Sequence, residues 1–177
     1  MNAFCPHCEA MTEQVMGEQE DVIPVRGEAI PVRVITHHCQ ACGLDHLSPQ
    51  EGDPLEEAYR IYRDRKQMLQ PEEIRAFRKQ LGLTQQEWSR VLGIGVATLN
   101  RYENGALQSE SHDQMLQLMM EPGNLLRTLS EKPGLLPDSK QAQVLEILQA
   151  QEPAGSLLAQ AEERFGRYSP DVYSGYV

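Results

Sequence analysis

The sequence lacks any long apolar run and has only four cysteines among its 177 residues. No apolar stretch approaches the roughly 18 residues that a membrane-spanning helix needs. The first residues, MNAFCPHCEA, also lack the basic, apolar and small-residue order of a signal peptide. We therefore expect a cytoplasmic protein with no membrane partner. In that reducing compartment, four cysteines indicate metal ligands or redox groups rather than structural disulfides.

The chain also lacks the common catalytic motifs. It contains no HExxH, no GxSxG and no glycine-rich loop that would cradle a phosphate. The enzyme alternatives are a zinc hydrolase or a dithiol oxidoreductase, and both would have to use the same four cysteines. We expect that the protein is not an enzyme.

Positive charge is scarce overall, because 16 basic residues face 26 acidic ones and the net charge is -10. The distribution is uneven, however. Between Arg60 and Arg101 there are nine bases and four acids, a local charge of +5, which leaves -15 for the rest of the chain. A basic middle between acidic ends is typical of a DNA-binding protein whose other parts contact something else. A basic helix that is merely solvated is the alternative.

The four cysteines form two CxxC pairs, Cys5 with Cys8 and Cys39 with Cys42. Two-residue spacing in a tight turn lets both thiolates point at one ion, and two such turns complete a tetrahedral shell. A closed shell leaves no position for a reactive water, so the spacing predicts one structural Zn²⁺ per chain. The redox alternative would need a helix N-terminus in a βαβ setting, which the sequence does not offer. Four histidines lie nearby, and because the cysteines fill the shell we expect them outside it: His7, His37, His38 and His46.

The pattern along the chain predicts a mainly α protein with a small β-containing, zinc-ribbon-like N-terminal module. Two β-branched strands, 22–25 and 30–35, flank Gly27 and Glu28 in a hairpin between the two CxxC turns. Helical spacing and capping residues then predict helices over 55–69, 72–81, 85–92, 96–103, 111–121, 125–129, 140–151 and 156–165. The expected parts are 1–47, a four-cysteine zinc-binding module; 48–69, a linker and connecting helix; 70–132, an all-α helix-turn-helix domain; and 133–177, a helical extension with an extended tail from residue 168.

The segment Gly82 to Gly105 predicts a helix-turn-helix. Thr84 and Glu87 form a capping-box pattern, and the glycines at 82, 93 and 105 end successive helices. The apolar residues expected between the helices are Trp88, Val91, Leu92, Val96, Leu99 and Tyr102. The last helix can present its remaining face to the major groove, where Arg101 would bind guanine and Thr98 or Ala97 would contact a thymine methyl.

Leu83-Thr84-Gln85, the Gly93 turn and Arg101-Tyr102-Glu103-Asn104-Gly105 resemble the Cro/Xre helix-turn-helix family. The resemblance implies that DNA contacts come from the start of one helix and the exposed face of the next, and that Arg78 pairs with Glu103. The predicted DNA-binding residues are Thr84, Gln85, Val96, Ala97, Thr98, Asn100 and Arg101.

Together with CPHC, the IPVR strand and HHCQACG, this order of modules resembles the antitoxins of the MqsA type, which join a YgiT-type zinc domain to an Xre-type helix-turn-helix. The resemblance covers about residues 3–130. It implies a homodimer that represses its own operon at a palindromic operator and neutralises a partner toxin. A stand-alone zinc-containing Xre-family regulator without a toxin is the alternative function.

The sequence departs from the MqsA pattern at two places. Ala97 stands where that family's reading helix carries a polar asparagine, and some 45 residues follow the helix-turn-helix domain. These differences predict a different operator. The tail SPDVYSGYV is also similar to the connector before a SocA-like (Panacea) domain in longer relatives, which would make this chain the front part of that architecture.

Overall fold

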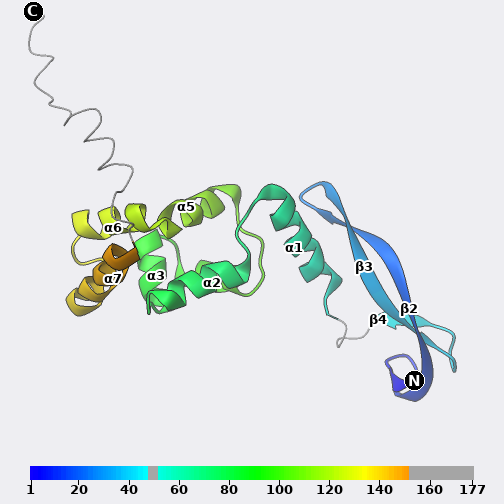
Figure 1. The fold of residues 1–177 in the computed structure, drawn as a ribbon. Coiled ribbons are helices and arrows are strands. Elements are labelled where there is room, and N and C mark those ends of the chain that lie inside the picture. The colour runs from blue at the N-terminus through cyan, green and yellow to red at the C-terminus, as the bar shows by residue number, and fades with distance from the viewer. Residues whose placement is uncertain (48–51, 152–177) are drawn as a thin grey trace, which may run out of the picture. The chain divides into compact units, whose positions relative to one another are not determined.

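The computed structural model describes residues 1–47 and 52–151. In these residues a small antiparallel sheet precedes seven helices, which confirms the predicted fold class (Figure 1). The predicted helix over 156–165 and the extended tail lie outside the described residues. The strands are β1 (Asn2–Cys5), β2 (Ala10–Val25), β3 (Glu28–Cys39) and β4 (Asp45–Leu47). The helices are α1 (Pro54–Lys66), α2 (Pro71–Gln80), α3 (Gln85–Leu92), α4 (Val96–Glu103), α5 (Glu110–Met120), α6 (Pro122–Glu131) and α7 (Asp138–Gln151).

The sheet is a long hairpin with one short strand added at each side, in the order β1-β2-β3-β4. Both predicted strand segments lie inside the hairpin, but β2 and β3 continue much further towards the cysteines. The turn falls on Arg26 and Gly27, with φ of 49° and 83°, one residue before the predicted Gly27-Glu28. Two successive left-handed residues match the twist of a two-residue hairpin turn, which is why glycine is suited to the second position.

The described residues form two compact units, residues 1–75 with 100–114 and residues 76–99 with those from 115 to 151. In the first unit, one face of the hairpin packs on α1. The buried residues of this core are Val25, Ile30, Val32, Val34, Ala58, Tyr62 and Met68. The connecting helix therefore shares an apolar core with the sheet. The domain boundaries expected from the sequence stay a prediction.

Helix α1 also carries a buried cation. Asp53 caps its start by accepting from the Leu55 amide, and Gln67 ends it in a left-handed conformation. Arg63 is 2% exposed and donates to the Gln108 side chain and to the carbonyls of Gly105 and Ala106. Burial lowers the pKa of Arg63, and these acceptors replace the water that its guanidinium loses on folding.

The second unit has an apolar core of leucine and valine side chains from short helices. Leu125 and Leu129 of α6 are fully buried, as are Val144 and Leu148 of α7. Gln141 of α7 donates to the Leu129 carbonyl at 2.6 Å, which ties α7 to α6. Helix α6 starts at Pro122, three residues before the predicted start, because proline is favourable in the first turn of a helix.

The helix predicted over 111–121 begins one residue earlier, at Glu110. The side chain of Ser109 accepts from the His112 amide at 3.2 Å, and its carbonyl accepts from the Asp113 amide at 2.9 Å. Ser109 therefore satisfies the amides that a helix leaves unpaired at its first turn. Across the described residues, no helix combines the length and apolar character needed to cross a membrane.

Candidate metal centre and nucleic-acid interface

The four cysteines lie on two turns at one end of the sheet. Cys5 ends β1 and Cys8 follows in the turn to β2, whereas Cys39 ends β3 and Cys42 follows in the turn to β4. Each turn is tightened by local hydrogen bonds: the Cys8 amide donates to Cys5 Sγ at 3.5 Å, and the Gly43 amide donates to the Cys39 carbonyl at 2.8 Å. Because β2 and β3 pair along their length, the two turns face each other.

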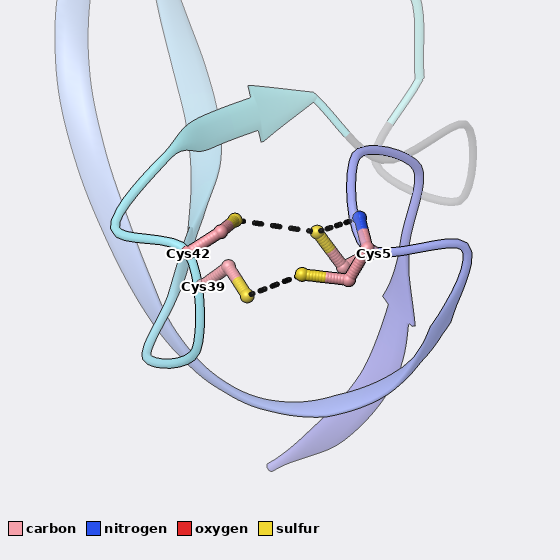
Figure 2. Close-up of side chains that lie close together, drawn as sticks. Cys5, Cys39 and Cys42 are labelled. Carbon is pink, nitrogen blue, oxygen red and sulfur yellow. Dashed lines mark hydrogen bonds between the residues drawn. The ribbon is translucent and has the colours of Figure 1, made fainter.

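The sulfur atoms form a cluster of the size that one ion needs. All four lie within 4.8 Å of one another, with Cys5 to Cys42 at 3.8 Å and Cys8 to Cys39 at 3.9 Å. A tetrahedral ion with metal–sulfur bonds of about 2.3 Å requires sulfur–sulfur distances of about 3.8 Å. Figure 2 shows the sulfurs of Cys39 and Cys42 directed from one turn towards the turn that holds Cys5. The structure thus brings the four predicted ligands together in a cluster that can hold a metal ion.

The thiols differ in proton affinity. Hydrogen bonds from the Thr12 hydroxyl and from backbone amides of its own turn lower the pKa of Cys39 to about 6. A hydrogen bond with Cys42, together with burial, raises the pKa of Cys8 to about 12. Four thiolates in such a small volume repel one another, and a bound cation offsets that repulsion.

The nearby histidines lie outside the cysteine cluster, as expected. His37 is buried and stacks on His46, with ring centroids 5.7 Å apart. His38 Nδ1 lies 2.8 Å from an Asp45 carboxylate oxygen on β4, and His7 is exposed. The stacked pair and the polar contact both join β3 to β4, so they support the strand that follows the second cysteine turn.

The predicted helix-turn-helix is present, with its capping box. Thr84 Oγ1 accepts from the Glu87 amide at 3.2 Å, while Glu87 Oε2 accepts from the Thr84 amide at 2.8 Å. Helix α3 ends at Gly93, whose φ is 71°, and α4 begins three residues later. A helix-turn-helix consists of two short helices joined by a tight turn that often contains glycine, and α3 and α4 are arranged in this way.

Helix α4 exposes the face that the sequence assigned to DNA. Ala97, Asn100 and Arg101 are exposed, Thr98 is half-buried, and Leu99 is fully buried on the opposite side. Val96 is 47% exposed, so the prediction that it belongs to the core is wrong. Val96 is the first residue of α4, and the side chains that face the core come later in the helix. At the start of α3, the capping residue Thr84 is exposed and Gln85, the first residue of the helix, is half-buried. Their contacts with DNA stay predictions.

Two arginines of α2 support this segment. Arg78 donates to the Leu83 carbonyl at 2.8 Å, just before α3. Arg75 Nε lies 3.9 Å from a Glu103 carboxylate oxygen, and Arg75 also donates to the Asn104 side chain at 3.0 Å. The Arg75 contacts hold the end of α4, a role that the sequence did not assign. The pairing of Arg78 with Glu103 stays a prediction.

Sequence reasoning also missed two residues. Thr12 contacts the cysteine cluster, and Arg63 contacts the loop after α4. Thr12 Oγ1 lies 3.2 Å from Cys39 Sγ although the two residues are 27 positions apart. Arg63 reads as one of several exposed bases on an amphipathic helix. Residue spacing in the sequence indicates neither contact, because each contact forms between segments that are distant in the sequence and meet only in the folded chain.

The fold and the cysteine cluster together define a class of protein: a small module with four clustered cysteines that can hold a metal ion, followed by a helix-turn-helix. The family model for the antitoxin component of bacterial toxin-antitoxin systems, MqsA, matches residues 3–138. Antitoxin MqsA of Escherichia coli (strain K12) is 30% identical to this chain over 135 residues, which cover 75% of this chain and 95% of that protein. The chain belongs to the MqsA antitoxin family, as its motifs indicated.

Proposed function

We propose that this chain is a zinc-containing, DNA-binding antitoxin that represses its own operon as a homodimer and neutralises a partner toxin. The observation that carries the proposal is the family relationship, which spans both the cysteine module and the helix-turn-helix. The exposed face of α4 supports DNA binding, since Ala97, Asn100 and Arg101 have no burial role there. The proposed role is regulatory and involves no catalysis.

Zinc is the metal that the donor set favours. Four thiolates in a tetrahedron suit Zn²⁺, whereas carboxylate and carbonyl oxygens suit harder ions such as Mg²⁺. The ligands would be Cys5, Cys8, Cys39 and Cys42. With all four positions filled by protein, the ion would supply folding energy to the two turns and would leave no site for a substrate.

The charges of the zinc module support a basic toxin as the partner. Residues 1–47 contain seven acidic side chains and two basic ones, a net charge of -5. Exposed acids follow the outer part of β2, at Glu18, Glu20 and Asp21. An acidic surface steers a basic partner and disfavours DNA phosphates, so toxin binding and DNA binding would use different parts of the chain.

The operator part of the proposal is tested with Arg101→Ala. If Arg101 binds a guanine edge, the variant should lose about 1–3 kcal/mol of specific binding and accept other bases at one position. Arg127→Ala is the matched control, because Arg127 is exposed on α6 and should change operator affinity much less. The measurement is a titration of DNA from the chain's own promoter at fixed salt. Equal affinities for wild type and Arg101→Ala would reject α4 as the reading helix.

The antitoxin part is tested by co-expressing the tagged chain with the product of the adjacent gene, followed by pull-down and zinc analysis. A stable complex with a toxic partner and about one zinc per chain is the expected result. Zinc and operator binding without any such partner would instead favour a stand-alone regulator.

A further inference from the structure

Thr12 contacts the proposed zinc site from outside the ligand set. It lies on β2, four residues after Cys8, and pairs with Ala3 on β1. Its Oγ1 is 3.2 Å from Cys39 Sγ. Of the four sulfurs, Cys39 and Cys5 are the two that are fully buried, so neither can rely on bulk water for hydrogen bonds.

The direction of this hydrogen bond follows from the neighbouring glutamine. Gln14 is 1% exposed, and its Nε2 donates to the Ala3 carbonyl at 3.2 Å and to Thr12 Oγ1 at 3.4 Å. A backbone carbonyl can only accept, so it fixes which end of the amide faces Ala3. The same amide nitrogen then faces Thr12. Because the hydroxyl oxygen accepts from Gln14, its one hydrogen is available for Cys39.

The same strands that place Thr12 also place its partners. Gln14 lies opposite Cys39 in the β2–β3 register, and the Gln14 amide donates to the Met1 carbonyl at 2.8 Å. Side chains alternate along a strand, so residues 12 and 14 lie on the same face of β2. The relay from Gln14 through Thr12 to Cys39 therefore rests on regular sheet geometry.

We propose that Thr12 is a positioning residue of the zinc site, whose hydroxyl, oriented by Gln14, donates a hydrogen bond to the Cys39 thiolate and strengthens zinc retention. The inference rests on the proposed zinc role of the four cysteines. A four-thiolate zinc site carries two negative charges, and a hydroxyl donor removes part of that excess from one sulfur. It also holds the Cys39 side chain in its ligating orientation.

The test measures zinc affinity of the full chain by competition with a chromogenic chelator. Thr12→Val keeps the shape and strand preference of threonine but removes the donor, and it should weaken zinc binding about 10-fold to 100-fold. Thr12→Ser keeps the hydroxyl. Thr36→Val is the matched control, because Thr36 lies on β3 of the same sheet and its hydroxyl donates to the Gly17 carbonyl, away from the cysteines. The zinc affinities of Thr12→Ser and Thr36→Val should stay within about threefold of wild type.

Cobalt substitution supplies a readout that a general loss of stability would not move. Loss of a hydrogen bond raises the energy of the sulfur lone pairs, so the thiolate-to-Co²⁺ charge-transfer band of Thr12→Val should shift to longer wavelength. Thr12→Ser and Thr36→Val should leave the band in place.

The inference is overturned if Thr12→Val binds zinc as tightly as wild type with an unshifted cobalt band, or if Thr12→Ser is as weak as Thr12→Val. In both cases wild-type zinc binding would stand. A wild-type chain that binds neither Zn²⁺ nor Co²⁺ would instead reject the metal role of the cysteines, and with it the role of Thr12.

Discussion

The cysteine end of the sheet and the helices from α3 onward are stabilised by different means. Near the cysteines the buried residues are largely polar or sulfur-containing, and they include Cys5, Gln14, His37 and Cys39. The helices instead bury leucines and a tryptophan, such as Trp88, Leu129 and Leu148. We infer that a segment with so little apolar core depends on the proposed zinc ion, whereas the helices depend on packing and capping. Changes in each region should therefore have effects of different size and kind.

The largest effect is expected from Cys39→Ser, which removes one of the four proposed zinc ligands. Structural zinc in small modules contributes about 10–16 kcal/mol of binding free energy, so we expect zinc to fall from one per chain to almost none. Amide protection should disappear in β1 and β4, while the helical circular dichroism signal remains. Ala41→Ser, an exposed change in the same turn, is the control. Retention of stoichiometric zinc by Cys39→Ser would contradict the assignment.

A smaller effect is expected from Leu148→Ala in the helical region. Leu148 is fully buried on α7, so truncation should cost about 2–5 kcal/mol of stability. Leu118→Ala is the matched control, because Leu118 is 60% exposed and should shift the denaturation midpoint very little. The midpoint in urea and the zinc content are measured together. A large loss of zinc in Leu148→Ala would contradict the proposal that the two regions are stabilised separately.

Thr84→Ala should have an effect of about 1 kcal/mol, since it removes the side-chain cap of α3. The Glu87 amide loses its acceptor, and Glu87 keeps only the Thr84 backbone amide as a partner. Thermal unfolding of the full chain measures the change. Thr84→Ser retains an oxygen acceptor and should restore most of the stability, so equal losses in both variants would show that capping is not the cause.

The smallest effect concerns pH. Hydrogen bonds from the Thr84 amide and hydroxyl hold the pKa of the Glu87 carboxyl below its usual range. A carboxyl with a lowered folded-state pKa adds stability that is present above about pH 4.5 and is lost as the pH falls through the folded value. Glu87→Gln should therefore flatten the decline in melting temperature between about pH 5 and pH 3. Glu146→Gln, at an exposed position on α7, is the charge-matched control.

The sequence predicted the parts whose geometry is local. The CxxC spacing, the Thr84 capping box and the Gly93 helix end are each decided by neighbouring residues, and the structure contains all three arrangements. The exposed face of α4 could also be predicted, because helical periodicity separates Ala97, Asn100 and Arg101 from the buried Leu99.

The parts that were missed depend on pairing across the chain. Strands β1 and β4 are four and three residues long, too short for an alternating pattern, and they form because the cysteine turns fold back on the hairpin. The outer part of β2, rich in Glu and Gln, has weak strand preference and is held by β3. The burial of Arg63 and the contact of Thr12 with Cys39 arise only after those pairings exist.

Helix α7 has a consequence for where the protein can be shortened. The family match ends at residue 138, and α7 begins there. Yet Val144 and Leu148 lie in the interior, and Lys140 Nζ donates to the Gly82 carbonyl at 3.1 Å, beside the turn that leads into α3. The end of the family match is thus not the end of the folding unit. A chain cut at residue 138 would keep every motif of the family but would lose the buried side chains of α7, and the apolar residues that pack against them would become exposed.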